Sequence, residues 1–174
     1  MEAWLTTVKP QPGLSLCVQN VDPADFNPAW CPPPPPAGRT LRLNAPAMVS
    51  VVNEAAGPRF AYVLAVDAKY EVALVLPAFG AVDPALAPGQ PLRPPEGQDI
   101  IPADLGELRF VALASDVPLN AAALEQTATD VVDLQACLSA VARAFCLGAD
   151  TRRSGALPNV GNWSAAVAIT RVIE

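Results

Sequence analysis

The sequence predicts a mostly β fold: a β-sandwich or half-open barrel of about seven strands, with one main α-helix before the last strand. Three observations lead to this class. Apolar side chains alternate along several segments, twenty prolines punctuate the chain, and only one segment has helical periodicity. With 174 residues the chain suffices for one domain. We expect a Pro-rich, Cys-bearing N-terminal arm with one short strand at residues 1–38 and a β-rich domain at residues 39–174.

The first strands are expected from short alternating runs. Leu14–Val18 is predicted as a strand inside the arm. After the proline run at 32–36, which favours an extended polyproline conformation, two further strands are expected at Arg39–Asn44 and Ala47–Asn53.

The segment Phe60–Pro77 has the clearest pattern, two alternating runs around a short polar break, and predicts a β-hairpin. Its large side chains fall on one parity in both runs. A shared core face therefore requires an odd number of loop residues, three at 67–69 or five at 67–71. Tyr62 and Leu64 should then share a face with Leu74. Because the other parity is also apolar, we expect cover on both faces.

A long proline-rich connection is expected at residues 78–104, with short extended pieces near Pro91–Arg93 and Ile100 that proline would confine to sheet edges. Gly106–Ser115 is predicted as a strand. The last strand is expected at Trp163–Ile173, after a polar loop at 149–161.

The one helix is predicted at about residues 130–146. Asp130 is a suitable N-cap residue, and Gly148 is placed to end the helix. Leu134, Leu138, Val141 and Phe145 would form one apolar stripe.

Four cysteines allow three disulfide pairings among Cys17, Cys31, Cys137 and Cys146. A bridge between Cys17 and Cys31 would order a Pro-rich segment that has little core of its own. Cys137 and Cys146 would lie about 13 Å apart along one straight helix, so a bridge there requires the helix to break. The alternative is four buried thiols in a cytoplasmic protein.

Composition narrows the function classes. The chain has no histidine, which removes Ser–His and Cys–His nucleophilic pairs and imidazole metal sites. We therefore expect no cofactor and no metal. A net charge of −6 argues against nucleic-acid partners, and no apolar run is long enough to span a membrane. The N-terminus lacks the pattern of a signal peptide.

The order of motifs from the hairpin onward resembles the DUF4384-type domain. The motifs are the hairpin ending in Leu-Pro, the run Leu86–Leu92, Gly106–Ser115 followed by Val117-Pro-Leu119, and the closing strand at Trp163. The resemblance covers about residues 39–174. Asp67–Tyr70 stands where the family usually has a glycine in the hairpin turn. The resemblance implies a non-catalytic accessory domain of a larger exported bacterial protein, found beside a caspase-like peptidase or kinase domain.

Three functions are compatible with these residues. The first is a binding or adaptor domain that recognises a protein or positions a catalytic domain, with Arg152 and Arg153 in a recognition loop. The second is structural self-association through the proline arm. The third is a hydrolase that pairs Asp99 with Asp104 or Asp67 with Glu71. We favour the non-enzymatic binding domain, in a periplasmic or secreted protein, with a cytoplasmic location as the alternative.

Overall fold

The computed structural model describes residues 12–20, 39–68, 72–77, 85–95, 99–118 and 163–174. Most of these residues lie in β-strands, which confirms the mostly β class. Within these ranges there is no helix. The helix expected at about residues 130–146 falls outside them and stays a prediction.

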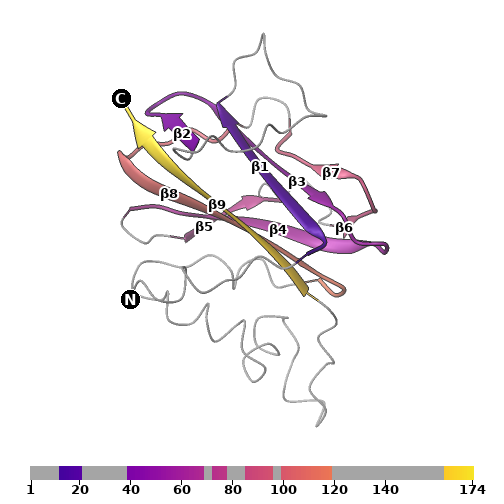
Figure 1. Cartoon of the computed structure of the whole chain (residues 1–174). Coiled ribbons are helices and arrows are strands. Elements are labelled where there is room, and N and C mark those ends of the chain that lie inside the picture. The colour runs from indigo at the N-terminus through magenta and orange to yellow at the C-terminus, as the bar shows by residue number, and fades with distance from the viewer. Residues whose placement is uncertain (1–11, 21–38, 69–71, 78–84, 96–98, 119–162) are drawn as a thin grey trace, which may run out of the picture.

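The strands form two sheets (Figure 1). A three-stranded sheet has the order β1-β3-β7, and a larger sheet has the order β2-β9-β8-β4-β5, with β6 paired to β4. Neither sheet closes into a barrel. The strand bounds are β1 Leu14–Asn20, β2 Arg39–Arg42, β3 Ala47–Asn53, β4 Arg59–Val66, β5 Val72–Leu76, β6 Ala85–Leu86, β7 Pro91–Leu92, β8 Gly106–Ser115 and β9 Trp163–Ile173.

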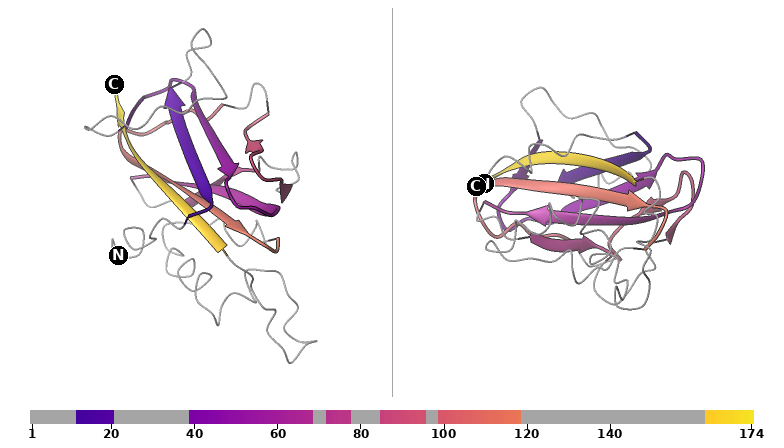
Figure 2. Two further views of the ribbon diagram at one scale, coloured as in Figure 1. Left: turned by 45° about the vertical axis from the view of Figure 1, so that its right-hand side comes forward. Right: turned by 90° about the horizontal axis from the view of Figure 1, so that it is seen from below.

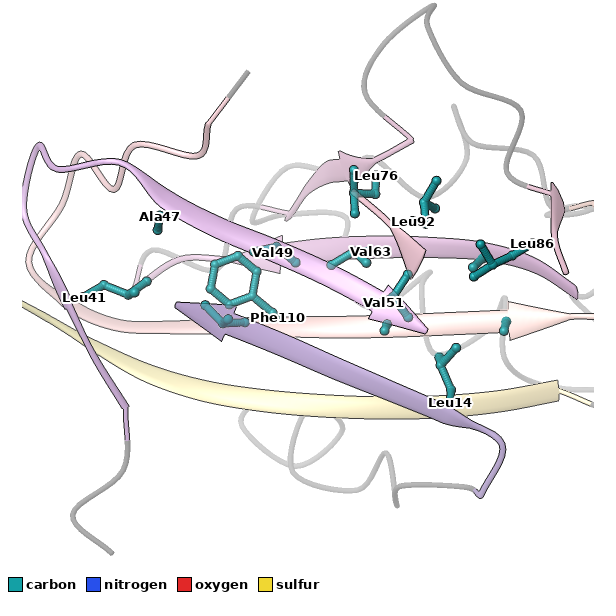
Figure 3. Close-up of a cluster of buried hydrophobic side chains, with 14 of the residues drawn as sticks. Leu14, Leu41, Ala47, Val49, Val51, Val63, Leu76, Leu86, Leu92 and Phe110 are labelled. Carbon is teal, nitrogen blue, oxygen red and sulfur yellow. The ribbon is translucent and has the colours of Figure 1, made fainter. Parts of the chain in front are cut away.

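The two sheets lie one over the other in the views of Figure 2, and one hydrophobic core fills the space between them (Figure 3). Alternate residues of each strand face it, because side chains alternate across a strand. Val49 and Val51 of β3 lie against Val63 of β4 and Phe110 of β8, and all four are fully buried. The strand at 14–20, expected within the arm, pairs with β3 along its whole length and contributes to this core.

The hairpin has the longer of the two loops expected from the sequence. Val66 pairs with Val72, so five residues at 67–71 separate the paired positions. Leu64 lies opposite Leu74, which confirms that these two share a face. The register then shifts between Val63 and Leu64, and Leu76 becomes the partner of Val63. This irregularity turns Leu76 onto the opposite face from Leu74, into the intersheet core.

The large side chains Tyr62 and Leu64 of β4 do not face the second sheet. Tyr62 and Leu64 lie opposite Leu113 and Val111 of β8, on the face of the larger sheet turned away from the intersheet core. The smaller residues Ala61 and Val63 face that core instead. Burial of both sets confirms that β4 is covered on both faces. Side-chain size therefore does not identify the intersheet face in this hairpin.

The two pieces of the proline-rich connection do lie at sheet edges. Pro91 and Leu92 form β7, which pairs with β3 at the edge of the smaller sheet. Ile100 makes a single bridge to Ala47 at the other end of β3.

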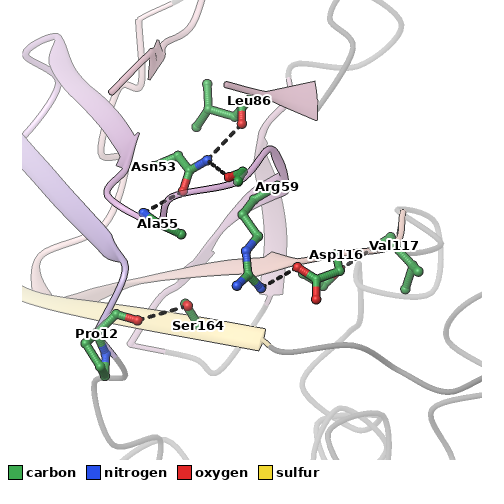
Figure 4. Close-up of polar contacts among 10 residues, drawn as sticks. Pro12, Asn53, Ala55, Arg59, Leu86, Asp116, Val117 and Ser164 are labelled. Atoms are coloured by element: carbon green, nitrogen blue, oxygen red, sulfur yellow. Dashed lines mark hydrogen bonds and ion pairs between the residues drawn. The ribbon is translucent and has the colours of Figure 1, made fainter. Parts of the chain in front are cut away.

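Polar contacts fasten the end of the smaller sheet that holds Asn53 (Figure 4). The Asn53 side chain is fully buried and continues the core-facing row of β3. Its Nδ2 donates to the carbonyl oxygens of Gly57 and Leu86 at 2.8 and 2.9 Å, and its Oδ1 accepts from the Ala55 N–H at 3.0 Å. A buried amide with all these bonds satisfied fixes the loops that it joins.

Candidate functional site: an arginine–isoleucine surface

The exposed large hydrophobic side chains of the described residues gather at one end of the larger sheet. They are Ile101, Leu105, Ile169 and Ile173, with exposed fractions of 59, 50, 52 and 42%. Two lie near the end of β9, and two lie in the segment that leads into β8. This is the end that holds β2 and the C-terminus in Figure 1, away from β6 and β7. This clustering is significant, because exposed aliphatic side chains are usually scattered singly over a protein surface.

Strand register shows which residues share this surface. β2 runs parallel to β9, so Arg42 lies opposite Ile173 and Thr40 lies opposite Arg171. β8 runs antiparallel on the other side of β9, with Glu107 opposite Arg171 and Arg109 opposite Ile169. All these residues have the parity opposite to Leu41, Val172 and Phe110, which face the intersheet core. We call Arg42, Ile169, Arg171 and Ile173 the arginine–isoleucine surface.

The loops around the surface hold its edge in place. The Leu43 N–H donates to the Ile173 carbonyl at 2.8 Å, and the Asn44 N–H donates to the Pro102 carbonyl at 2.9 Å. Leu105 directly precedes Gly106, the partner of Val172. Gly106 has a φ of 122°, and a Cβ there would lie 3.3 Å from the Ala68 Cβ. Glycine is therefore favoured where the chain enters β8 beside the surface.

The arginines of this region fall into two groups. Arg109 forms an ion pair with Glu107, and Arg39 donates from its guanidinium to the Val18 carbonyl at 2.8 Å. Partial burial lowers the pKa of the Arg39 guanidinium through desolvation. Arg42 and Arg171, by contrast, are exposed, and neither forms an ion pair with a described residue. The surface thus presents two available guanidinium groups beside exposed aliphatic side chains.

Several residues singled out in the sequence lie outside the described residues, namely Cys31, Cys137, Cys146, Arg152, Arg153 and Glu71. Cys17 is described: it is buried on the face of β1 away from the intersheet core, and the Gln19 amide donates to its Sγ at 2.9 Å. The cysteine pairings and the recognition loop at 149–161 therefore stay predictions.

Three of the carboxylates suggested for a hydrolase lie within the described residues. Asp99 and Asp104 are both exposed in the segment before β8, whereas Asp67 is half-buried and directly follows β4. Among the described residues, no group of three or more His, Cys, Asp or Glu residues is arranged to hold a metal ion. Nor does the described part of the chain contain a helix long and apolar enough to cross a membrane.

Sequence reasoning did not identify the arginine–isoleucine surface. The signal was present in β9, where Arg171 interrupts an otherwise apolar row that includes Ile169 and Ile173. What was missing was the parallel pairing of β2 with β9, which places Arg42 beside that row. This pairing joins residues about 130 positions apart, beyond the reach of local patterns.

No protein-family model, curated protein or solved structure matches the chain.

Proposed function

We propose that the chain is a non-catalytic binding domain, an adaptor or protein-recognition module of a larger exported bacterial protein. One observation carries the proposal. Two of the exposed large hydrophobic side chains of the described residues, Ile169 and Ile173, lie on one face of β9 with the exposed Arg171 and beside the exposed Arg42. Apolar side chains with arginines among them are typical of protein-binding surfaces. The absence of histidine from the whole sequence favours binding over catalysis.

We also propose three finer properties of the chain. They are the resemblance to the DUF4384-type domain over about residues 39–174, a sandwich arrangement with a helix at about 130–146, and disulfides that suit a periplasmic or secreted location. A neighbouring peptidase or kinase domain would be positioned by this module. Support comes from the two open sheets around one core and from the match of predicted strand positions to β3, β8 and β9.

Affinity capture with matched variants tests the function. The wild-type chain and two variants, Arg171→Glu and Arg93→Glu, would be used to retain proteins from an extract of the native host. We expect at least one protein to be retained by the wild type and by the Arg93→Glu control but lost with Arg171→Glu. Each variant must first give the wild-type circular dichroism spectrum. Equal retention of every protein by the three chains would contradict the proposal.

A further inference from the structure

The arginine–isoleucine surface alternates charge and apolarity along β9. Ile169, Arg171 and Ile173 follow one another on one face of the strand, and Arg42 lies beside Ile173 on β2. Residues two apart on a strand are about 7 Å apart. A cation therefore sits between two aliphatic side chains, with a second cation, Arg42, diagonally across on β2. A partner that fits has a carboxylate between aliphatic groups at similar spacing.

The exposed arginines of the surface favour a partner that carries negative charge. The whole chain carries a net charge of −6, which disfavours the long-range approach of acidic molecules. Arg42 and Arg171 are local exceptions, since neither forms an ion pair with a described carboxylate. Glu107 lies opposite Arg171 but is paired with Arg109. An arriving carboxylate would find two guanidinium groups that can each bind it in bidentate fashion.

The size of the surface favours a short segment. From Ile169 to Ile173 the strand rises about 13 Å, and the three strands β2, β9 and β8 span about 10 Å. The surface comprises four residues, far fewer than the roughly 20–30 residues that each partner contributes to a stable protein pair. A second copy of the chain would need contacts well beyond this surface. We infer that the arginine–isoleucine surface binds a short acidic segment of a partner protein, in which carboxylate and aliphatic side chains alternate.

This inference rests on the proposed binding function and names the partner's chemistry. Its test is an NMR titration of the intact, isotope-labelled chain with three capped seven-residue peptides at millimolar concentration. In the first peptide Glu alternates with Leu, in the second Lys alternates with Leu, and in the third Glu alternates with Gly. We expect the Glu–Leu peptide to shift the amide signals of β2 and β9. The other two peptides should bind at least about tenfold more weakly. Sodium chloride should weaken the Glu–Leu binding, because it screens exposed charges.

Charge reversal provides the matched control. Arg171→Glu should abolish binding of the Glu–Leu peptide and favour the Lys–Leu peptide, while Arg93→Glu should leave the preference unchanged. The inference is overturned if no peptide shifts β2 or β9, if the Lys–Leu peptide binds the wild type equally well, or if Arg171→Glu changes nothing. It is also overturned if sedimentation shows a dimer of the wild type that Arg171→Glu dissociates, since the occupant is then a second copy. If the chain does not prefer the Glu–Leu peptide but still captures a protein in an Arg171-dependent way, the acidic partner is refuted. The proposed binding function would then still stand.

Discussion

The side chain of Asn20 closes the outer edge of β2 through the backbone of Arg42. Asn20 Oδ1 accepts from the Arg42 N–H at 3.2 Å, and Asn20 Nδ2 donates to the Thr40 carbonyl at 2.9 Å. One amide from the smaller sheet thus takes the place of a neighbouring strand at the edge of the larger sheet. Such cover protects an edge strand from pairing with another chain. It also fixes the strand that carries Arg42.

Replacing Asn20 should loosen β2 in graded steps. Asn20→Ala removes both bonds and should cost about 1–2 kcal/mol of unfolding free energy, whereas Asn20→Asp keeps the acceptor for the Arg42 N–H and loses only the bond to the Thr40 carbonyl. Amide hydrogen exchange gives the specific readout: the Arg42 amide should exchange faster in Asn20→Ala than in Asn20→Asp. Unchanged exchange at Arg42 in the alanine variant would show that Asn20 does not hold this edge.

The buried amide of Asn53 should be among the most sensitive polar positions of the described chain. Asn53→Ala leaves two carbonyls and one N–H without their partner, so we expect a loss of about 3 kcal/mol or more in unfolding free energy. Gln90→Ala is the matched control, because Gln90 accepts one exposed bond from Ala87. That control should cost less than about 1 kcal/mol. Urea denaturation of both variants measures the difference, and similar losses would refute the role given to Asn53.

The register shift in the hairpin predicts unequal costs for two leucines of β5. Leu76 is fully buried in the intersheet core, while Leu74 is half-buried on the other face. Leu76→Ala should therefore cost about 3–4 kcal/mol, and Leu74→Ala should cost about half as much or less. Both values come from urea denaturation under identical conditions. A larger loss for Leu74→Ala than for Leu76→Ala would mean that the strict alternation continues through β5.

The cysteines test the proposed exported location. Mass spectrometry of the native chain under non-reducing conditions should show a decrease corresponding to two disulfides. After proteolysis, Cys17 and Cys31 are expected in one linked peptide. Cys17→Ser should leave the thiol of Cys31 open to alkylation. Four alkylatable cysteines in the native protein would overturn the exported location and favour the cytoplasmic alternative.

Local patterns predicted the elements better than their arrangement. The bounds of β3, β8 and β9 follow from alternating apolar residues, and the odd-numbered loop follows from the parity of Leu64 and Leu74. The intersheet face could not be read this way, because both parities of β4 are apolar and buried. Large residues such as Tyr62 suggested one core face, whereas the core between the sheets is lined by Ala61 and Val63.

The pairing of strands that are far apart in the sequence could not be predicted from local patterns. The register shift in β5 and the parallel contact of β2 with β9 depend on tertiary packing. The arginine–isoleucine surface depends on the pairing of β2 with β9. The sequence alone therefore indicated Arg171 and its isoleucine neighbours but not Arg42. The sequence favoured loop residues for recognition. The arginine–isoleucine surface, however, lies on the face of a sheet.

Site-specific photo-cross-linking in the native host tests most directly whether this face binds a partner. A photoreactive amino acid would replace Ile173 in one variant and Gln90 in another, both in the intact chain. Gln90 is also exposed but lies between β6 and β7, at the other end of the sheets (Figure 1). We predict a discrete cross-linked protein from position 173, absent from position 90 and lost when Arg171→Glu is added. Cross-links of equal yield from both positions, or none from position 173, would contradict the account.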